Sequence, residues 1–275
     1  MFKKRLVVLL CGAVMISGLA VGCGSGSVEG DNAKITISGS TSVGPTMEVL
    51  AEVYEKDNDV NIEVQQVGSS AGIKNTIDGT SDLGMTSRDL KDEETKEVDG
   101  TQIAIDGIAI ITNTANKVTN LTSEQVKDIF TGKITNWKEV GGEDAQIVVV
   151  SREDGSGTRD GFQDILGFES DELIKDAQIC DGSGNVKSTV EGNENAIAYI
   201  SFGYLGDTLN DVKIDGVEPT DANVVDGKYP ISRPFIVVNK KDGLSDVAKA
   251  FVDFIMSEEG QNIVAEEGFI KAPTK

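Results

Sequence analysis

A repeated order of short strand, hydroxyl-rich turn and helix constrains the fold of this chain more than any other feature. Residues 33–37 form an apolar, β-branched run, and the turn 39–44 leads into Pro45, which suits the first position of a helix. The same order recurs at 61–78 and begins again at 82–88. Such alternation predicts an α/β fold with an open sheet whose ligand lies beyond the carboxyl ends of the strands.

Two long apolar segments, at 103–112 and 231–239, are predicted to be strands that join two lobes. Between them the sequence predicts helices at 122–130, 161–166 and 186–191 and strands at 146–150 and 196–201. After the second long strand, a helix is expected from Ser245 towards Ala265.

The lobe boundaries follow from this order. We expect lobe I to comprise residues 33–105 and 235–275 and lobe II to comprise residues 106–234, with hinge strands at the ends of lobe II. The expected architecture has mixed sheets with helices on both faces.

The first residues have the pattern of an export signal. A basic start at residues 3–5 precedes the apolar run 6–21, which is too short and too rich in glycine for a comfortable membrane span. Small residues then lead to Cys23, a pattern that resembles a lipobox. We therefore expect a signal peptide at 1–22, a lipidated Cys23 and a flexible tether over 23–32. An ordinary signal peptide followed by a chance cysteine is the alternative.

Charge and composition exclude several function classes. The formal net charge of −21 argues against nucleic acid or anionic lipid surfaces as partners. The chain contains no histidine, so it cannot build a Ser-His-Asp or Cys-His apparatus or a His-ligated metal site. We expect no catalytic residues, no metal and no cofactor. Cys180 would be the one cysteine left after processing, so no intrachain disulfide is expected.

The segment 151–158 combines one arginine, hydroxyls and flexible glycines before an expected helix. The guanidinium presents a planar fork of N–H donors that suits oxyanions. Glycines allow backbone amides to approach an anion closely, and a helix start leaves such amides unpaired. This segment therefore predicts an anion cradle, with Arg152 as its full positive charge.

Seven segments together resemble a known family. They are 39–42, 68–72, 82–88, 106–109, 121–137, 152–158 and 229–234. In order and spacing they are similar to the phosphate-binding lipoproteins of bacterial ABC-type phosphate importers. The resemblance implies a two-lobed periplasmic-binding-protein-like fold of type II. It also implies an extracytoplasmic protein, expected to be a monomer, that is held at the cell membrane by its lipid and delivers inorganic phosphate to permease subunits.

Carried over position by position, the resemblance implies these phosphate contacts: Thr41, Ser42, Ser69, Ser87, Arg152, Ser156, Gly157 and Thr158. Asp154 is expected to pair with Arg152 and orient its guanidinium, whereas Glu153 is expected to be exposed. Ser87 departs from the family pattern, in which an aspartate often stands at this position and accepts a hydrogen bond from a proton carried by phosphate. A hydroxyl can both accept and donate, so discrimination against sulfate is expected to be weaker here.

Three other functions compete with this one. Residues 68–72 fit the Gly-x-Ser-x-Gly elbow of serine hydrolases, with Ser70 as the nucleophile, but no histidine is present to activate it. A receptor for another tetrahedral oxyanion, such as sulfate or molybdate, is the nearest alternative. An adhesin-type surface lipoprotein would suit the acidity and the tether, but it would not explain Arg152 in its glycine- and hydroxyl-rich turn.

Overall fold

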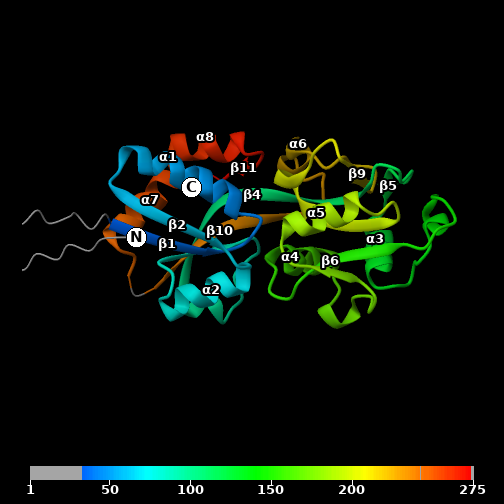
Figure 1. The fold of residues 1–275 in the computed structure, drawn as a ribbon, viewed down its shortest axis with the longest axis horizontal. Coiled ribbons are helices and arrows are strands. Elements are labelled where there is room, and N and C mark those ends of the chain that lie inside the picture. The colour runs from blue at the N-terminus through cyan, green and yellow to red at the C-terminus, as the bar shows by residue number, and fades with distance from the viewer. Residues whose placement is uncertain (1–32, 242, 274–275) are drawn as a thin grey trace, which may run out of the picture. The chain divides into compact units, whose positions relative to one another are not determined.

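A mixed sheet runs through the chain, with its strands in the order β2-β1-β3-β10-β4-β8-β6-β7 (Figure 1). The computed structural model describes residues 33–241 and 243–273. The expected signal peptide, Cys23 and tether lie outside the described residues. The strands are β1 Ala33–Gly39, β2 Val60–Gln66, β3 Leu83–Thr86, β4 Val98–Asn113, β5 Asn120–Leu121, β6 Val148–Arg152, β7 Gln178–Cys180, β8 Ala196–Ser201, β9 Leu209–Ile214, β10 Ser232–Lys240 and β11 Ile270–Lys271.

The helices follow the strands in the expected alternation. They are α1 Gly44–Asp57, α2 Ser69–Asp78, α3 Ser123–Phe130, α4 Gly157–Leu166, α5 Ser183–Glu191, α6 Asp221–Val225, α7 Asp246–Ile255 and α8 Glu258–Glu266. Short 3-10 turns lie at Glu94–Lys96, Trp137–Val140, Ser170–Glu172 and Phe202–Tyr204. None of the helices in the described ranges is long and apolar enough to span a membrane.

Two apolar cores define two lobes. Lobe I packs β1–β3 against α1, α7 and α8, with Leu50 and Phe251 fully buried. Lobe II packs β6 and β8 against α3–α5, with Phe162 stacked on Tyr199 at 4.0 Å between ring centroids. Strand β4 supplies side chains to both cores. The α/β fold with two lobes and two long connecting strands is therefore confirmed.

Strand direction explains why the sheet is mixed. Strands β2, β1 and β3 are parallel, as are β7, β6 and β8. Between these groups, β10 runs antiparallel to β3 and β4, and β4 runs antiparallel to β8. The expected lobe boundaries, at 105/106 and 234/235, fall inside β4 and β10, and they stay a prediction.

Several elements differ from the sequence expectation at their ends. Helix α2, expected from residue 73, begins four residues earlier, as α4 does, and α5 begins three residues earlier than expected. The hydroxyl-rich turns therefore form the first helical turns. Helix α3, whose sequence has the Thr122 and Gln125 spacing of a capping box, begins with that box: the Thr122 side chain accepts from the Gln125 backbone, and the Gln125 side chain accepts from the Thr122 backbone. The expected helix after Ser245 is two helices, because α7 ends at Ile255 and the Ser257 side chain caps α8.

Candidate functional site

The hydroxyl-rich turns of both lobes meet in one place, which we call the hydroxyl ring. Lobe I supplies Ser40, Thr41, Ser42, Ser69 and Ser87, and lobe II supplies Thr158 and Ser183. The Ser42 hydroxyl lies 2.9 Å from that of Thr158 and 3.2 Å from that of Ser183, so the lobes touch here. On the lobe I side, Ser40 donates to the Ser87 hydroxyl at 2.9 Å. All of these side chains are buried except Thr41, which is half-buried.

Helix N-termini border this ring. Helices α2 and α5 begin after Gly68 and Gly182, whose φ angles of 90° and 80° are accessible at low cost only to glycine. Neither helix has a side-chain cap. In α2 the Ser70 amide donates to the Gly155 carbonyl, and the other first amides of the two helices can serve a ligand. Helix α4 differs, because the Ser156 hydroxyl accepts from the Arg159 backbone at 3.3 Å. A hydroxyl that accepts this bond can still donate its own proton.

Arg152 lies at the carboxyl end of β6 and points into the ring. Its side chain is 2% exposed, and its guanidinium donates to the hydroxyls of Ser183 and Thr41, each at 3.0 Å. A third contact, to Thr158, is longer at 3.4 Å. One buried cation thus reaches hydroxyls of both lobes.

Glu153, and not Asp154, holds the Arg152 guanidinium. Glu153 accepts from Arg152 Nε at 2.7 Å and from a terminal nitrogen at 2.6 Å, and it also accepts from the Gly182 backbone. Burial alone raises the pKa of the Glu153 carboxyl, but the hydrogen bonds and charge of Arg152 outweigh burial, so this pKa is lowered.

The expected pairing of Asp154 with Arg152 is therefore wrong, and so is the expectation that Glu153 is simply exposed. Asp154 accepts from Arg159 at 2.6 Å, and its side chain is 93% exposed. The reason is local geometry. Asp154 stands just before the turn at Gly155, φ 83°, with its side chain exposed, whereas the longer Glu153 side chain lies along the fork of Arg152.

A second cation, Arg233, was missed as a site residue. Its terminal nitrogens donate to the Ser42 hydroxyl at 3.2 Å and to the Ser87 carbonyl at 3.1 Å. Asp106 faces it across β4 and β10 and accepts from it at 2.9 and 3.1 Å. Burial raises the pKa of the Asp106 carboxyl, and the charge of Arg233 opposes that rise. Arg152 is thus not the only full positive charge of the site.

The sequence did contain a signal for this pair. Arginine is scarce in this chain, and Arg233 interrupts an otherwise apolar strand that was expected to lie at a lobe boundary. A charge is buried in such a strand only when it has a partner. The cross-strand register that supplies Asp106 is a property of the folded sheet.

Gly157 shows how closely the lobes approach. A Cβ atom at this position would lie 2.3 Å from the Ser69 hydroxyl oxygen and 2.8 Å from that of Ser87. Both distances are shorter than normal Cβ contacts, so any larger residue would force the Ser69 and Ser87 side chains to shift. The structure thus brings all eight expected contact residues to one place, three of them at this closest point.

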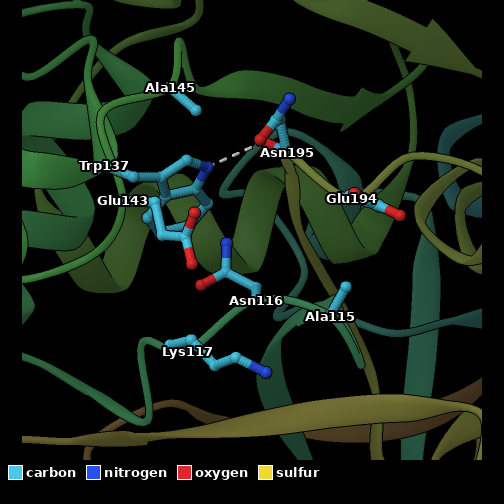
Figure 2. Close-up of a pocket in the computed structure, with 8 residues that line it drawn as sticks. All are labelled: Ala115, Asn116, Lys117, Trp137, Glu143, Ala145, Glu194 and Asn195. Carbon is cyan, nitrogen blue, oxygen red and sulfur yellow. Dashed lines mark hydrogen bonds between the residues drawn. The ribbon is translucent and has the colours of Figure 1, made fainter.

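Among the described residues, one hollow lies away from the ring and another lies at its rim. Figure 2 shows a pocket in lobe II where Trp137 donates to the Asn195 carbonyl at 3.0 Å, and no expected site residue lines it. A surface hollow at the rim of the ring does contain Thr41 and Ser183, together with Tyr204. The described residues include no group of His, Cys, Asp and Glu that could hold a metal ion.

The chemistry of this arrangement suits an anion. Neutral hydroxyls, helix-start amides and two guanidiniums converge, and both nearby carboxylates are already bonded to an arginine. Ser70, the nucleophile of the hydrolase alternative, accepts a hydrogen bond from Arg88 at 3.2 Å. A guanidinium cannot act as the base that such a nucleophile needs.

Known proteins resemble this chain over nearly its whole length. A family model described as a PBP superfamily domain matches residues 25–259. The phosphate-binding protein PstS of Bacillus subtilis is 35% identical over 98% of this chain and 95% of its own length.

Solved structures of other proteins also resemble this chain. A phosphate ABC transporter substrate-binding protein from Clostridium perfringens, solved with bound phosphate, is 59% identical with a TM-score of 0.85, covering 87% of this chain and 100% of that one. An ABC-type phosphate transport receptor from Vibrio cholerae is 38% identical with a TM-score of 0.75 over the same shares. The chain belongs to the PBP superfamily and, within it, to the family of PstS phosphate-binding proteins.

Proposed function

We propose that this protein captures inorganic phosphate between its two lobes and delivers it to the permease of an ABC transporter. The observation that carries the proposal is the buried Arg152 guanidinium, which contacts hydroxyls from both lobes. The proposed phosphate contacts are those expected from the sequence, with Arg233 and Glu153 added as the groups that orient the hydroxyls and the guanidinium.

Donor count explains how so acidic a protein could bind an anion. Stripping water from a dianion costs tens of kcal/mol unless its oxygens are satisfied. Charge-assisted hydrogen bonds return about 1.5–3 kcal/mol each, so roughly ten donors are needed. The ring hydroxyls, the first amides of α2 and α5 and the guanidinium are such donors. The remote negative charge is screened by salt over about 10 Å and opposes binding only weakly.

The transport role has further parts. A signal peptide would direct export, and a lipid on Cys23 would then hold the protein outside the cell at the membrane. The protein would act as a monomer that opens to admit phosphate and closes around it. The closed form would be the one that docks on the permease. No enzymatic step, metal or cofactor takes part in this proposal.

Calorimetry tests the proposal directly. Protein stripped of ligand is titrated with phosphate, sulfate and molybdate, and one phosphate is expected to bind per chain. Absence of heat with every anion would contradict it and would favour an adhesin-type lipoprotein.

The lipid anchor is tested in cells that carry Cys23→Ser. The expected result is loss of membrane association, with phosphate binding retained by the released protein.

A receptor for a different tetrahedral oxyanion is the second candidate. The observation that favours it is Ser87, a hydroxyl in the ring where the family often has a carboxylate. The two carboxylates at the site are both bonded to arginine, so neither is placed to select a protonated anion. Tighter binding of sulfate than of phosphate in the same titration would establish this alternative.

A further inference from the structure

We propose that Arg88 and Asp160 form a latch between the lobes, which stabilises the closed protein and slows phosphate release without touching the anion. The inference rests on the proposed function, since it concerns the lifetime of the phosphate complex. Arg88 follows β3 in lobe I, and Asp160 lies in the first turn of α4 in lobe II. Arg88 Nε donates to Asp160 at 2.9 Å.

Groups of lobe I hold the two terminal nitrogens of the Arg88 guanidinium in position. Its two terminal nitrogens donate to both carboxylate oxygens of Glu94, each at 2.8 Å. They also donate to the Asp89 carbonyl and the Ser70 hydroxyl. The side chain is 3% exposed. Among the described residues, the bond from Nε is the one Arg88 contact that crosses to lobe II, so opening would break this contact and leave the other donors satisfied.

The latch sits beside the ring. Arg88 directly follows Ser87, and Asp160 is two residues beyond Thr158. A second crossing bond lies nearby, from the Ser70 backbone N–H to the Gly155 carbonyl at 3.1 Å. The ion pair between Arg88 and Asp160 therefore holds together the two turns that would enclose the anion. It also gives Ser70 a structural role in place of the nucleophilic one.

The ion pair between Arg88 and Asp160 stabilises the closed form more than the open form. In that form Asp160 is partly buried against Arg88, and removing one partner of such a pair is costly. In an open form Arg88 would keep Glu94, and Asp160 would be hydrated. A change at Asp160 should thus alter the balance of closed and open states, and with it the rate of dissociation.

The test compares Asp160→Asn with the matched control Asp164→Asn, in the full protein. Asp164 lies one turn further along α4 and is exposed. Phosphate dissociation is measured by stopped flow. Asp160→Asn is expected to raise the dissociation rate about tenfold, which corresponds to about 1.4 kcal/mol, with little change in the association rate. Asp164→Asn should behave as the unaltered protein.

Three further measurements separate a latch from a fold defect. The thermal midpoint of the ligand-free protein should be unchanged in Asp160→Asn, Asp160→Ala should dissociate faster still, and Asp160→Glu should restore slow release. An unaltered dissociation rate in both Asp160→Asn and Asp160→Ala, or an equal effect of Asp164→Asn, would overturn the latch. If the unaltered protein binds no phosphate, the proposed function itself fails, which is a different result.

Discussion

The two lobes contribute different chemistry to the same ring. Lobe I presents neutral hydroxyls, from Thr41, Ser42, Ser69 and Ser87, and the amides at the start of α2. Lobe II presents a cation, Arg152, together with the carboxylate of Glu153 that holds it. Arg233 lies between them on β10 and bonds to lobe I groups. Lobe I thus contributes dipoles to the ring, whereas lobe II adds a full charge to its own hydroxyls.

This division has a physical consequence for the affinity and the selectivity of anion binding. Dipoles fixed on a rigid lobe can orient an anion, but full charge supplies more of the attraction. An anion on lobe I alone would be weakly held, and closure would bring Arg152 onto it. We therefore expect changes on lobe II to alter affinity most and changes on lobe I to alter discrimination.

Removal of the lobe II charge should have the largest effect. Arg152→Ala deletes the guanidinium and leaves Glu153 without its partner, so phosphate affinity should fall about a hundredfold or more, since charge-assisted bonds contribute about 1.5–3 kcal/mol each. Calorimetry measures the dissociation constant. Lys133→Ala, an exposed lysine of lobe II, is the matched loss of one charge. Equal affinities for Arg152→Ala and the unaltered protein would refute the charged role of lobe II.

A side chain that keeps the two lobes apart should have the next largest effect on phosphate affinity. In Gly157→Ala the new methyl group would lie 2.3 Å from the Ser69 hydroxyl, so the lobes could not close fully. Affinity should fall by several tens of times, on the order of 2 kcal/mol by the cost of an overpacked contact. Gly184→Ala is the control, because its Cβ would meet nothing within 4 Å. Undiminished binding in Gly157→Ala would show that close approach is not required.

Two adjacent carboxylates of lobe II, Glu153 and Asp154, are expected to differ in their effect on phosphate binding. Glu153→Gln loses the charge that orients Arg152 and should weaken binding about tenfold, whereas Asp154→Asn should have little effect, because Asp154 pairs with Arg159 at the surface.

The depressed pKa of Glu153 means that its ion pair stabilises the fold above the unfolded pKa of about 4.3. That contribution is lost as pH falls through the lower folded pKa. Acid unfolding should show this loss for the unaltered protein and not for Glu153→Gln; a larger effect of Asp154→Asn on binding would reverse the assignment.

The smallest effect is expected on lobe I and concerns selectivity. Ser87→Asp introduces an acceptor that a protonated phosphate can satisfy and sulfate cannot, so discrimination against sulfate should rise by about fivefold or more, near the 1 kcal/mol of an ordinary hydrogen bond. Competition titrations measure the ratio of the two affinities. Ser87→Ala removes the acceptor without adding charge and should not raise discrimination. Equal ratios in Ser87→Asp and the unaltered protein would remove Ser87 as a selectivity position.

Local patterns were sufficient for much of the fold. Strand 196–201 is observed with the expected ends, the capping box of Thr122 and Gln125 is present, and the hydroxyl-rich turns precede or begin helices as expected. These features depend on neighbouring residues, whose spacing and hydrogen-bonding capacity can be inferred from sequence. By contrast, β7, β9 and α6 were not predicted, because their short segments lack a clear periodicity and are held by neighbours distant in sequence.

For the site, the order of residues was enough to predict which residue types would gather: an arginine, hydroxyls and glycines at the starts of helices, in a chain without histidine. The pairing of each carboxylate with its arginine became visible only in the folded chain. Glu153 holds Arg152, Asp154 holds Arg159, and Asp106 meets Arg233 across two strands. The physical reason is that pairing depends on the direction of each side chain and on strand register. Both are set when distant segments pack together, whereas the order of neighbouring residues leaves them open.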